Sequence, residues 1–311
     1  MKIKTDKANP GDLVDVFLVK RKYQGIFLEN LGEKDILLLK LDSGYNIGFR
    51  KRDILGVKII KKFKEEERSD LDLKFSREKP KIGMIITGGT IAARLNPKKG
   101  GVDWLTKPED LFRIYPKIFD IANVELEVPF MKASEDMDFK DWQKISRVTK
   151  KFLDRQDIKG VIITHGTDFL HYTSAALSFF LRNLNKPVVL TYSQRSIDRA
   201  SSDANLNLQC SALAAVSDIA EVMLVGHGTV NDDFCYAMPG TKTRKMHSSK
   251  RDAFKSVNRK PFAKIFPDKI ELISEYKKRE KKKRVKADVR FEEKVALLKV
   301  YPGQEPEILD Y

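Results

Sequence analysis

The sequence predicts an α/β protein in which a domain built on a parallel sheet follows a small all-β barrel. From Lys81 onward, apolar segments of strand length alternate with segments of helical spacing, which is typical of a parallel sheet covered by helices on both faces. Residues 10–60 instead contain four or five short segments rich in β-branched and aromatic residues, separated by turn signals. Short strands at this density favour a small barrel.

Changes in composition divide the chain into five parts. We expect a barrel domain over 1–60, a charged linker over 61–80, an α/β domain over 81–275, a basic linker over 276–292 and the start of a second α/β domain over 293–311. The basic run is expected to be a flexible linker, with an RNA contact as the alternative. The last part has a strand-like segment, a turn and the beginning of a helix, so the sequence predicts that most of a second domain is absent, in a chain that is truncated, split or naturally short.

Composition limits the functional classes. No apolar run reaches the roughly 20 residues that span a bilayer, and the first residues lack the apolar core of a signal peptide. Cys210 and Cys235 form no CxxC pair, which favours a reducing compartment, so we expect a cytoplasmic protein without a membrane contact. The net charge of +15 attracts polyanions, although a proteome rich in Lys and Glu produces the same excess.

The elements of the α/β domain follow from periodicity. Strands are predicted over 81–87, 124–131, 160–166, 186–193 and 221–228. Helices are predicted over 108–122, 138–155, 168–184 and 205–219. Asp138 is a suitable N-cap for the second of these helices. Its apolar face contains Trp142, Ile145, Val148 and Phe152.

Polar residues follow most of the predicted strands. They lie at Thr87–Thr90, Ala133–Asp136, Thr164–Asp168, Ser193–Arg195 and Gly226–Thr229. Parallel strands place their carboxyl ends at one edge of the sheet, where ligands of such sheets bind. The sequence therefore predicts a site at this edge.

Residue types at this edge favour a threonine nucleophile. The Gly-Gly-Thr turn lacks the Lys-Ser/Thr of a phosphate-binding P-loop, and the chain has no GxGxxG or GxSxG. Its four histidines show no metal-ligand spacing, so we expect no metal, and we interpret His165 as structural. A nucleophilic Thr90 needs a base and an orienting group, and Thr167, Asp168 and Lys242 are the candidates.

The segments "TGGTIA" (87–92) and "THGTDFL" (164–170) resemble the two signatures of the asparaginase/glutaminase family. "ASEDMD" (133–138), "GTKT" (240–243) and "FKSVN" (254–258) fall in the family's order. The resemblance covers residues 82 to about 260. It implies Thr90 as the nucleophile, and Thr167, Asp168 and Lys242 as the second catalytic group. We expect a proton relay between Lys242 and Thr167 in the substrate-bound state; the alternative is that Lys242 stays cationic and polarises Thr167. The resemblance also implies that Ser134 and Glu135 bind the α-carboxylate and α-amino groups of the substrate.

Three further parts resemble the D subunits of archaeal tRNA-dependent amidotransferases, a branch of this family. These are 193–208, 235–254 and the N-terminal barrel. This resemblance implies that ammonia released from glutamine or asparagine passes to a partner, the E subunit of the amidotransferase, which amidates Glu-tRNA(Gln). It implies a homodimer of heterodimers and no cofactor in this chain, with ATP and Mg at the partner subunit.

Two departures from the family leave alternatives open. The loop 94–111 contains no tyrosine, although free asparaginases usually carry a catalytic tyrosine there, and Phe169 replaces a small residue. The alternatives are a free L-asparaginase and a non-catalytic RNA-binding or scaffold protein on a decayed hydrolase fold. The barrel opposes the first alternative, and the intact set of candidate catalytic residues opposes the second.

Overall fold

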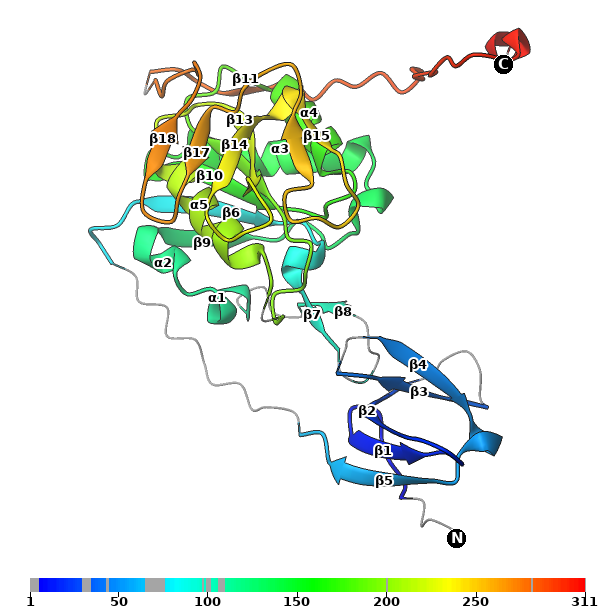
Figure 1. Cartoon of the computed structure of the whole chain (residues 1–311). Coiled ribbons are helices and arrows are strands. Elements are labelled where there is room, and N and C mark those ends of the chain that lie inside the picture. Colours follow the sequence, from blue (N-terminus) through cyan, green and yellow to red (C-terminus); the bar gives the residue numbers. More distant parts are fainter. Residues whose placement is uncertain are drawn as a thin grey trace.

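The computed structural model describes residues 6–29, 35–42, 45–64, 76–96, 98, 102–105, 110–199, 201–280 and 282–310. An N-terminal β domain precedes an α/β domain, and the last residues extend away from the α/β domain (Figure 1). This architecture confirms the predicted fold class.

The N-terminal domain is a curled antiparallel sheet. Its strands are β1 (Leu13–Phe17), β2 (Lys22–Leu28), β3 (Ile36–Lys40), β4 (Asn46–Arg50) and β5 (Gly56–Lys61), in the order β4-β3-β2-β1-β5. Val14, Leu39, Phe49 and Val57, from four of these strands, share one buried cluster, which requires the sheet to curl around it. Among the described residues β4 and β5 are not paired with each other, so the barrel is not closed by hydrogen bonds there.

The α/β domain is built on an eight-stranded mixed sheet in the order β18-β17-β14-β13-β12-β10-β6-β9. The five predicted strands are β6 (Lys81–Ile86), β9 (Asn123–Glu127), β10 (Ile158–Thr164), β12 (Val188–Thr191) and β13 (Val222–His227), and all of them pair in parallel. Three antiparallel strands that the sequence did not predict extend one edge: β14 (Cys235–Pro239), β17 (Ala263–Ile265) and β18 (Ile270–Leu272). Two of these strands are only three residues long, too short for a clear alternation.

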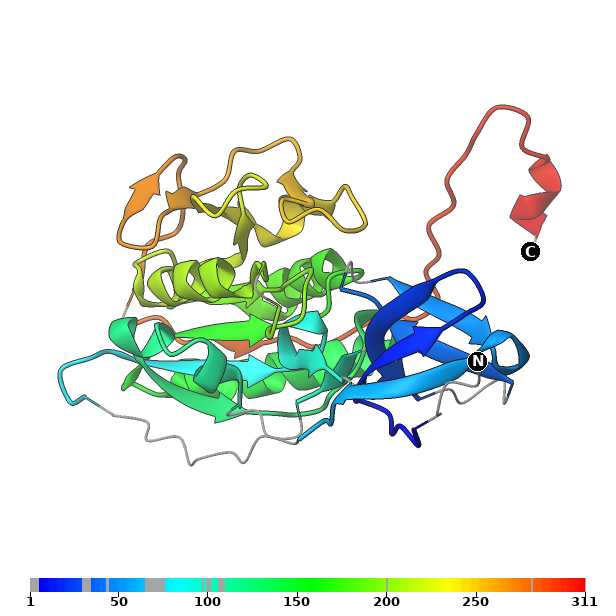
Figure 2. The same ribbon diagram turned by 60° about the horizontal axis from the view of Figure 1, so that its bottom comes forward.

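Helices cover both faces of this sheet (Figure 2). On one face α5 (Ala204–Val216) packs with the short helices α1 (Asp110–Ile114) and α2 (Ile118–Ile121). On the other face lie α3 (Phe139–Asp154) and α4 (Leu170–Phe180). The single helix predicted over 108–122 is broken between α1 and α2, where Pro116 lacks a backbone N–H.

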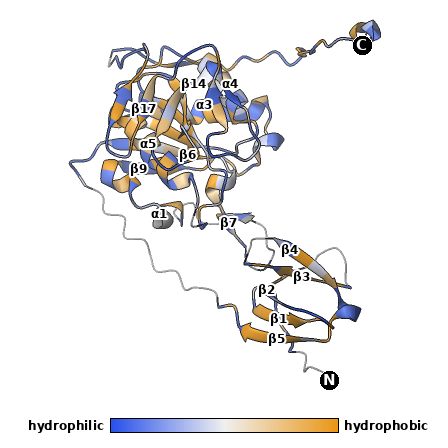
Figure 3. Ribbon diagram, in the orientation of Figure 1, coloured by the Kyte–Doolittle hydropathy of each residue, from blue (hydrophilic) through white to orange (hydrophobic). Residues whose placement is uncertain are grey.

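Alternation along the strands assigns side chains to the two faces. Met84 lies in the cluster under α5, whereas its neighbour Ile85 lies in the cluster under α3 and α4. Ile162 and Ile163 divide in the same way. Because both faces are buried, the central strands are continuously hydrophobic (Figure 3).

The predicted cap of α3 is confirmed. The Asp138 carboxylate accepts hydrogen bonds from the backbone N–H groups of Lys140 and Asp141, and the Asp141 side chain accepts the Asp138 N–H. Both partners of the capping box are therefore present.

The basic run after residue 275 is docked on the α/β domain, in contrast to the flexible linker that was expected. β19 (Lys286–Ala287) pairs with β11 (Leu181–Arg182), Val285 is buried, and the Lys277 carbonyl oxygen accepts a hydrogen bond from the Ala220 N–H. These contacts are backbone pairing and apolar burial, which the charge pattern does not reveal.

The strand expected after residue 293 is not formed. Val295, Leu297 and Val300 are 75%, 86% and 84% exposed, and the segment ends in a short 3-10 helix, η5 (Pro306–Asp310). A strand requires a paired neighbour, and this segment lies along no edge of the sheets (Figure 1).

Candidate active site

The turn after β6 crosses directly over the loop after β10. Gly88 and Gly89 have φ values of +118° and +81°, which side chains rarely adopt. A Cβ atom on Gly88 would lie 2.3 Å from the Lys132 carbonyl oxygen, and one on Gly89 would lie 2.3 Å from the Gly166 nitrogen. Only glycines fit at these two positions, because the backbones of three strand-end loops are in contact there.

Thr90 begins a single 3-10 turn, η2 (Thr90–Ala92), and is half-buried. Its hydroxyl makes no hydrogen bond to another residue in the described part of the chain. By contrast, the hydroxyl of Thr87 donates to the Thr164 carbonyl oxygen at 2.8 Å. Thr87 therefore fixes the turn by a hydrogen bond, whereas no residue in the described part of the chain forms a hydrogen bond with the Thr90 hydroxyl.

The loop after β9 brings Ser134 and Glu135 to the same place. Ser134 is 2% exposed, and its hydroxyl lies 3.2 Å from Glu135 Oε2 and 3.3 Å from the Phe169 nitrogen. Lys132 anchors this loop, because its ammonium bonds both oxygens of Asp141 at 3.0 and 2.8 Å while its backbone N–H donates to the Thr87 carbonyl oxygen. The structure thus places both predicted substrate-binding residues beside the Thr90 turn.

A lysine joins the two polar side chains of the loop after β10. Lys245 Nζ lies 2.8 Å from Thr167 Oγ1 and 2.8 Å from Asp168 Oδ1. The Lys245 side chain is 8% exposed, whereas that of Asp168 is 58% exposed. A nearly buried ammonium is therefore held between a threonine hydroxyl and a carboxylate that faces solvent.

The lysine in this position is Lys245, and the prediction of Lys242 is wrong in this respect. Lys242 ends the turn η4 (Gly240–Lys242) and is exposed. The strand that follows, β15 (Thr243–Lys245), alternates, so that buried Thr243 and Lys245 share a face. Alternation along β15 leads from Thr243 to Lys245, but the sequence alone does not show that Thr243 faces inward. The resemblance of "GTKT" to a family segment indicated Lys242 instead.

Packing of the turn against α4 determines where β15 starts. A Cβ atom on Gly240 would lie 2.5 Å from Ser178 Oγ, and the Ser174 hydroxyl donates to the Gly240 carbonyl oxygen at 2.9 Å. From there β15 pairs with β16 (Phe254–Ser256), and Lys245 is the last residue of its strand. The hairpin thus carries Lys245 to the loop that begins α4.

His165 supports this loop from the interior of the domain. It is fully buried, with Nδ1 2.8 Å from the Gly166 carbonyl oxygen and Nε2 2.9 Å from Thr173 Oγ1. Burial lowers its pKa to about 4, against a smaller opposing effect of the Gly166 carbonyl. A neutral imidazole that donates through Nδ1 and accepts at Nε2 satisfies both contacts, which supports a structural role.

The loop after β12 is held by one buried carboxylate. Both oxygens of Asp203 accept from the Gln194 N–H, at 3.0 and 2.9 Å, and one also accepts from the Arg195 N–H at 3.2 Å. Asp203 is 0% exposed, so these backbone donors compensate the burial of its oxygens.

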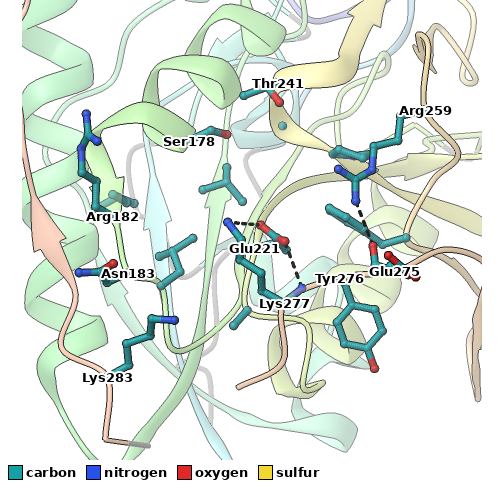
Figure 4. A pocket seen from close by; sticks show the side chains of 17 residues that line it. Ser178, Arg182, Asn183, Glu221, Thr241, Arg259, Glu275, Tyr276, Lys277 and Lys283 are labelled. Atoms are coloured by element: carbon teal, nitrogen blue, oxygen red, sulfur yellow. Dashed lines mark hydrogen bonds and ion pairs between the residues drawn. The ribbon is translucent and has the colours of Figure 1, made fainter. Parts of the chain in front are cut away.

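The opposite end of the sheet contains an open hollow of about 750 Å³. Figure 4 shows Arg182, Lys277 and Lys283 around it, together with the carboxylates Glu221 and Glu275. Lys277 Nζ lies 4.0 Å from Glu221 Oε2. This hollow contains none of the predicted site residues. The chemistry-bearing side chains lie instead in the strand-end loops.

The described part of the chain contains neither a cluster of metal ligands nor a helix of membrane-spanning type. No group of three His, Cys, Asp or Glu side chains is placed to hold a metal ion. None of the helices there is long and apolar enough to cross a membrane.

Comparisons with known proteins agree with the fold. Residues 81–278 match the family model "Asparaginase, N-terminal", and residues 8–60 match the "GatD N-terminal domain". The thermostable L-asparaginase from Thermococcus kodakarensis superposes with a TM-score of 0.64 at 29% identity, over 74% of this chain and 66% of that one. L-asparaginase I from Vibrio cholerae gives 0.63 at 30% identity, over 74% and 67%. The second domain of the chain is thus of the asparaginase type.

Other relatives match both domains of the chain, and they define its family more narrowly. The chain is 46% identical over 312 residues to the glutamyl-tRNA(Gln) amidotransferase D subunit of Thermococcus kodakarensis, covering 97% of this chain and 70% of that protein. It is 40% identical to the corresponding D subunit of Sulfolobus acidocaldarius, covering 97% and 68%. The chain belongs to the family of glutamyl-tRNA(Gln) amidotransferase D subunits.

Proposed function

We propose that this protein hydrolyses the side-chain amide of glutamine or asparagine, with Thr90 as the nucleophile. The observation that carries the proposal is the Lys245–Thr167–Asp168 group, held through the Gly89–Gly166 contact beside a threonine hydroxyl that no described residue engages. Two threonines with one buried lysine supply the nucleophile and the proton-transfer group that acyl transfer requires.

In the first half of the reaction, Thr90 Oγ1 attacks the amide carbon and the C–N bond breaks, so that ammonia leaves and an acyl-enzyme remains. The Thr167 hydroxyl, which accepts a hydrogen bond from Lys245, relays the proton lost by the Thr90 hydroxyl to the departing nitrogen, with Lys245 as its partner in the relay. In the second half, a water attacks the ester and the bond to Thr90 Oγ1 breaks; the same relay carries a proton of the water to Thr90 Oγ1, so that the acid product leaves and the Thr90 hydroxyl is restored. Asp168 orients the ammonium of Lys245 from the solvent side.

Ser134 and Glu135 bind the amino-acid end of the substrate in this proposal. The buried Ser134 hydroxyl would donate to the α-carboxylate, and the exposed Glu135 carboxylate would pair with the α-ammonium. Both lie on the short 3-10 turn η3 (Ser134–Asp136). Because the backbone fixes this turn against Gly166, the reacting amide would be held at a constant distance from Thr90.

The ammonia is used by a second protein chain in this proposal. The relatives are named as D subunits of glutamyl-tRNA(Gln) amidotransferase, which supports assembly with another subunit. In this proposal the complex is cytoplasmic, and its E subunit binds ATP and Mg and amidates Glu-tRNA(Gln). The complex would be a homodimer of heterodimers, and this chain itself would need no cofactor.

Ammonia release from glutamine and from asparagine, with and without the partner and charged tRNA, tests the proposal. Thr90→Ala should lower turnover by about 10³-fold or more with unchanged circular dichroism, whereas Thr90→Ser should retain part of it. Near-normal turnover by Thr90→Ala would refute the nucleophile. Equal rates with and without tRNA and partner would favour a free asparaginase, and no turnover under any condition would favour a binding protein.

A further inference from the structure

The guanidinium of Arg251 joins two strand-end loops to the hairpin that carries Lys245. Arg251 lies in the turn between β15 and β16. Its Nη1 donates to the Val230 carbonyl oxygen at 3.2 Å and to Asp232 Oδ2 at 3.0 Å, and its Nη2 donates to the Ser201 carbonyl oxygen at 2.6 Å. Ser201 belongs to the loop after β12, and the other two acceptors belong to the loop after β13.

The backbone of Arg251 is fixed as well. Its carbonyl oxygen accepts a hydrogen bond from the Tyr192 hydroxyl at 2.7 Å. Tyr192 is 0% exposed at the end of β12, and its ring lies 4.5 Å from that of Phe254. The turn is therefore attached to the edge of the sheet by both its side chain and its main chain.

The acceptors of the guanidinium are themselves rigidly placed. Asp232 Oδ1 lies 3.0 Å from His227 Nε2, and His227 Nδ1 lies 2.7 Å from Asn207 Oδ1. The Asn207 amide in turn donates to the Tyr192 carbonyl oxygen at 2.9 Å. Through these bonds Arg251 is connected to β12, β13 and α5, which form the body of the domain.

We propose that Arg251 is a positioning residue for the reaction, and that it acts by fixing the hairpin so that the Lys245 ammonium stays on Thr167. This inference rests on the proposed function. Lys245 is the last paired residue before the turn, opposite Phe254, and the Met246 N–H donates to the Ala253 carbonyl oxygen across it. A lysine stem is flexible, so the position of the ammonium depends on the backbone beneath it.

Arg251→Ala tests the inference in the full-length protein assayed with its amidotransferase partner and glutamine. A displacement of about 1 Å can cost up to ~10²-fold in rate, so we expect kcat per folded molecule to fall by at least about tenfold while KM changes by less than about threefold. The matched control is Lys255→Ala, in β16 of the same hairpin. It removes an exposed cation that bonds the neighbouring Asp252, and it should leave kcat unchanged.

A second variant keeps the test valid if Arg251→Ala does not fold. Asp232→Asn keeps the contacts of Arg251 to Ser201 and Val230 and makes the contacts of residue 232 to Arg251 and His227 neutral. The kcat should therefore fall less than in Arg251→Ala, again with little change in KM. A lower Tm with full kcat per folded molecule in either variant would show that Arg251 only stabilises the fold, and would overturn the inference. If Lys245→Met retains full turnover, the proposed function itself fails, whatever Arg251→Ala does.

Discussion

Lys245 Nζ lies 2.8 Å from Thr167 Oγ1, although 78 residues separate the two in the chain. The contact connects the loop after β10 with the β15–β16 hairpin, which follows the antiparallel strand β14. It provides the lysine of the candidate site.

Lys245→Met should abolish most of the amidase activity, whereas Lys242→Met should not. Removal of the ammonium leaves Thr167 without its proton-transfer partner, and general acid–base groups contribute about 10²–10⁴-fold. The two lysines are three residues apart and carry the same charge. Lys242→Met is therefore the control for the loss of a positive charge in Lys245→Met. Comparable losses of kcat in both variants would contradict the assignment to Lys245.

Glu135→Gln should raise KM for glutamine more than it lowers kcat. The variant keeps the shape of the side chain and removes the charge that pairs with the α-ammonium of the substrate. Hydrogen bonds to charged groups contribute about 1.5–3 kcal/mol, so KM should rise by about tenfold or more. Asp136→Asn, at the neighbouring exposed position, is the control, and an equal effect there would argue against a specific role of Glu135.

Gly89→Ala should disrupt both stability and activity. Its φ of +81° is strained for alanine, and the new Cβ would lie 2.3 Å from the Gly166 nitrogen, so we expect a loss of at least about 2 kcal/mol. Gly303 has φ of +82° with nothing within 4 Å of a Cβ. Gly303→Ala therefore introduces the same backbone strain without a clash, and it should lower the Tm less than Gly89→Ala does. A stable Gly89→Ala variant by thermal denaturation would contradict the close contact of the two loops.

Neutral, buried His165 should make the protein less stable in acid. Its pKa is lowered from 6.5 to about 4, so the unfolded chain binds a proton that the folded one does not. Its contribution is complete above pH 6.5 and is lost as the pH falls toward 4, amounting to about 3 kcal/mol by linkage. Urea unfolding of the protein and of His165→Gln from pH 7 to 4 measures it. If the two curves have the same pH slope, His165 is not the cause.

Deletion of residues 1–75 should spare amide hydrolysis and weaken the transfer of amide to Glu-tRNA(Gln). None of the candidate catalytic residues lies in the N-terminal sheet, and the α/β domain has its own two core clusters. The measurement is glutaminase turnover beside formation of Gln-tRNA(Gln) with the partner subunit. Unchanged amidation by the shortened chain would exclude a role of this domain in assembly.

Much of the fold could be read from local patterns. The five parallel strands, α3 to α5 and the cap at Asp138 follow from periodicity and capping chemistry, because buried parallel strands must be apolar on both faces. Thr90, Thr167 and Asp168 could be singled out because they stand just after such strands, whereas the role of Ser134 came from the resemblance to the asparaginase/glutaminase family. The edge strands β17 and β18 could not, since three-residue elements carry too few positions to show a period.

The sequence by itself determined which loops meet, because the carboxyl ends of parallel strands share one edge and the glycines at 88, 89 and 166 permit backbone contact there. Only the tertiary structure decided which lysine reaches Thr167. That depends on where the turn at Gly240 packs on α4, which sets the start and the facing of β15 and so places Lys245 inward and Lys242 in solvent. The position of Arg251 was likewise not readable, since its three acceptors come from loops 19 to 50 residues away. Contacts of this range are products of packing, and no local pattern encodes them.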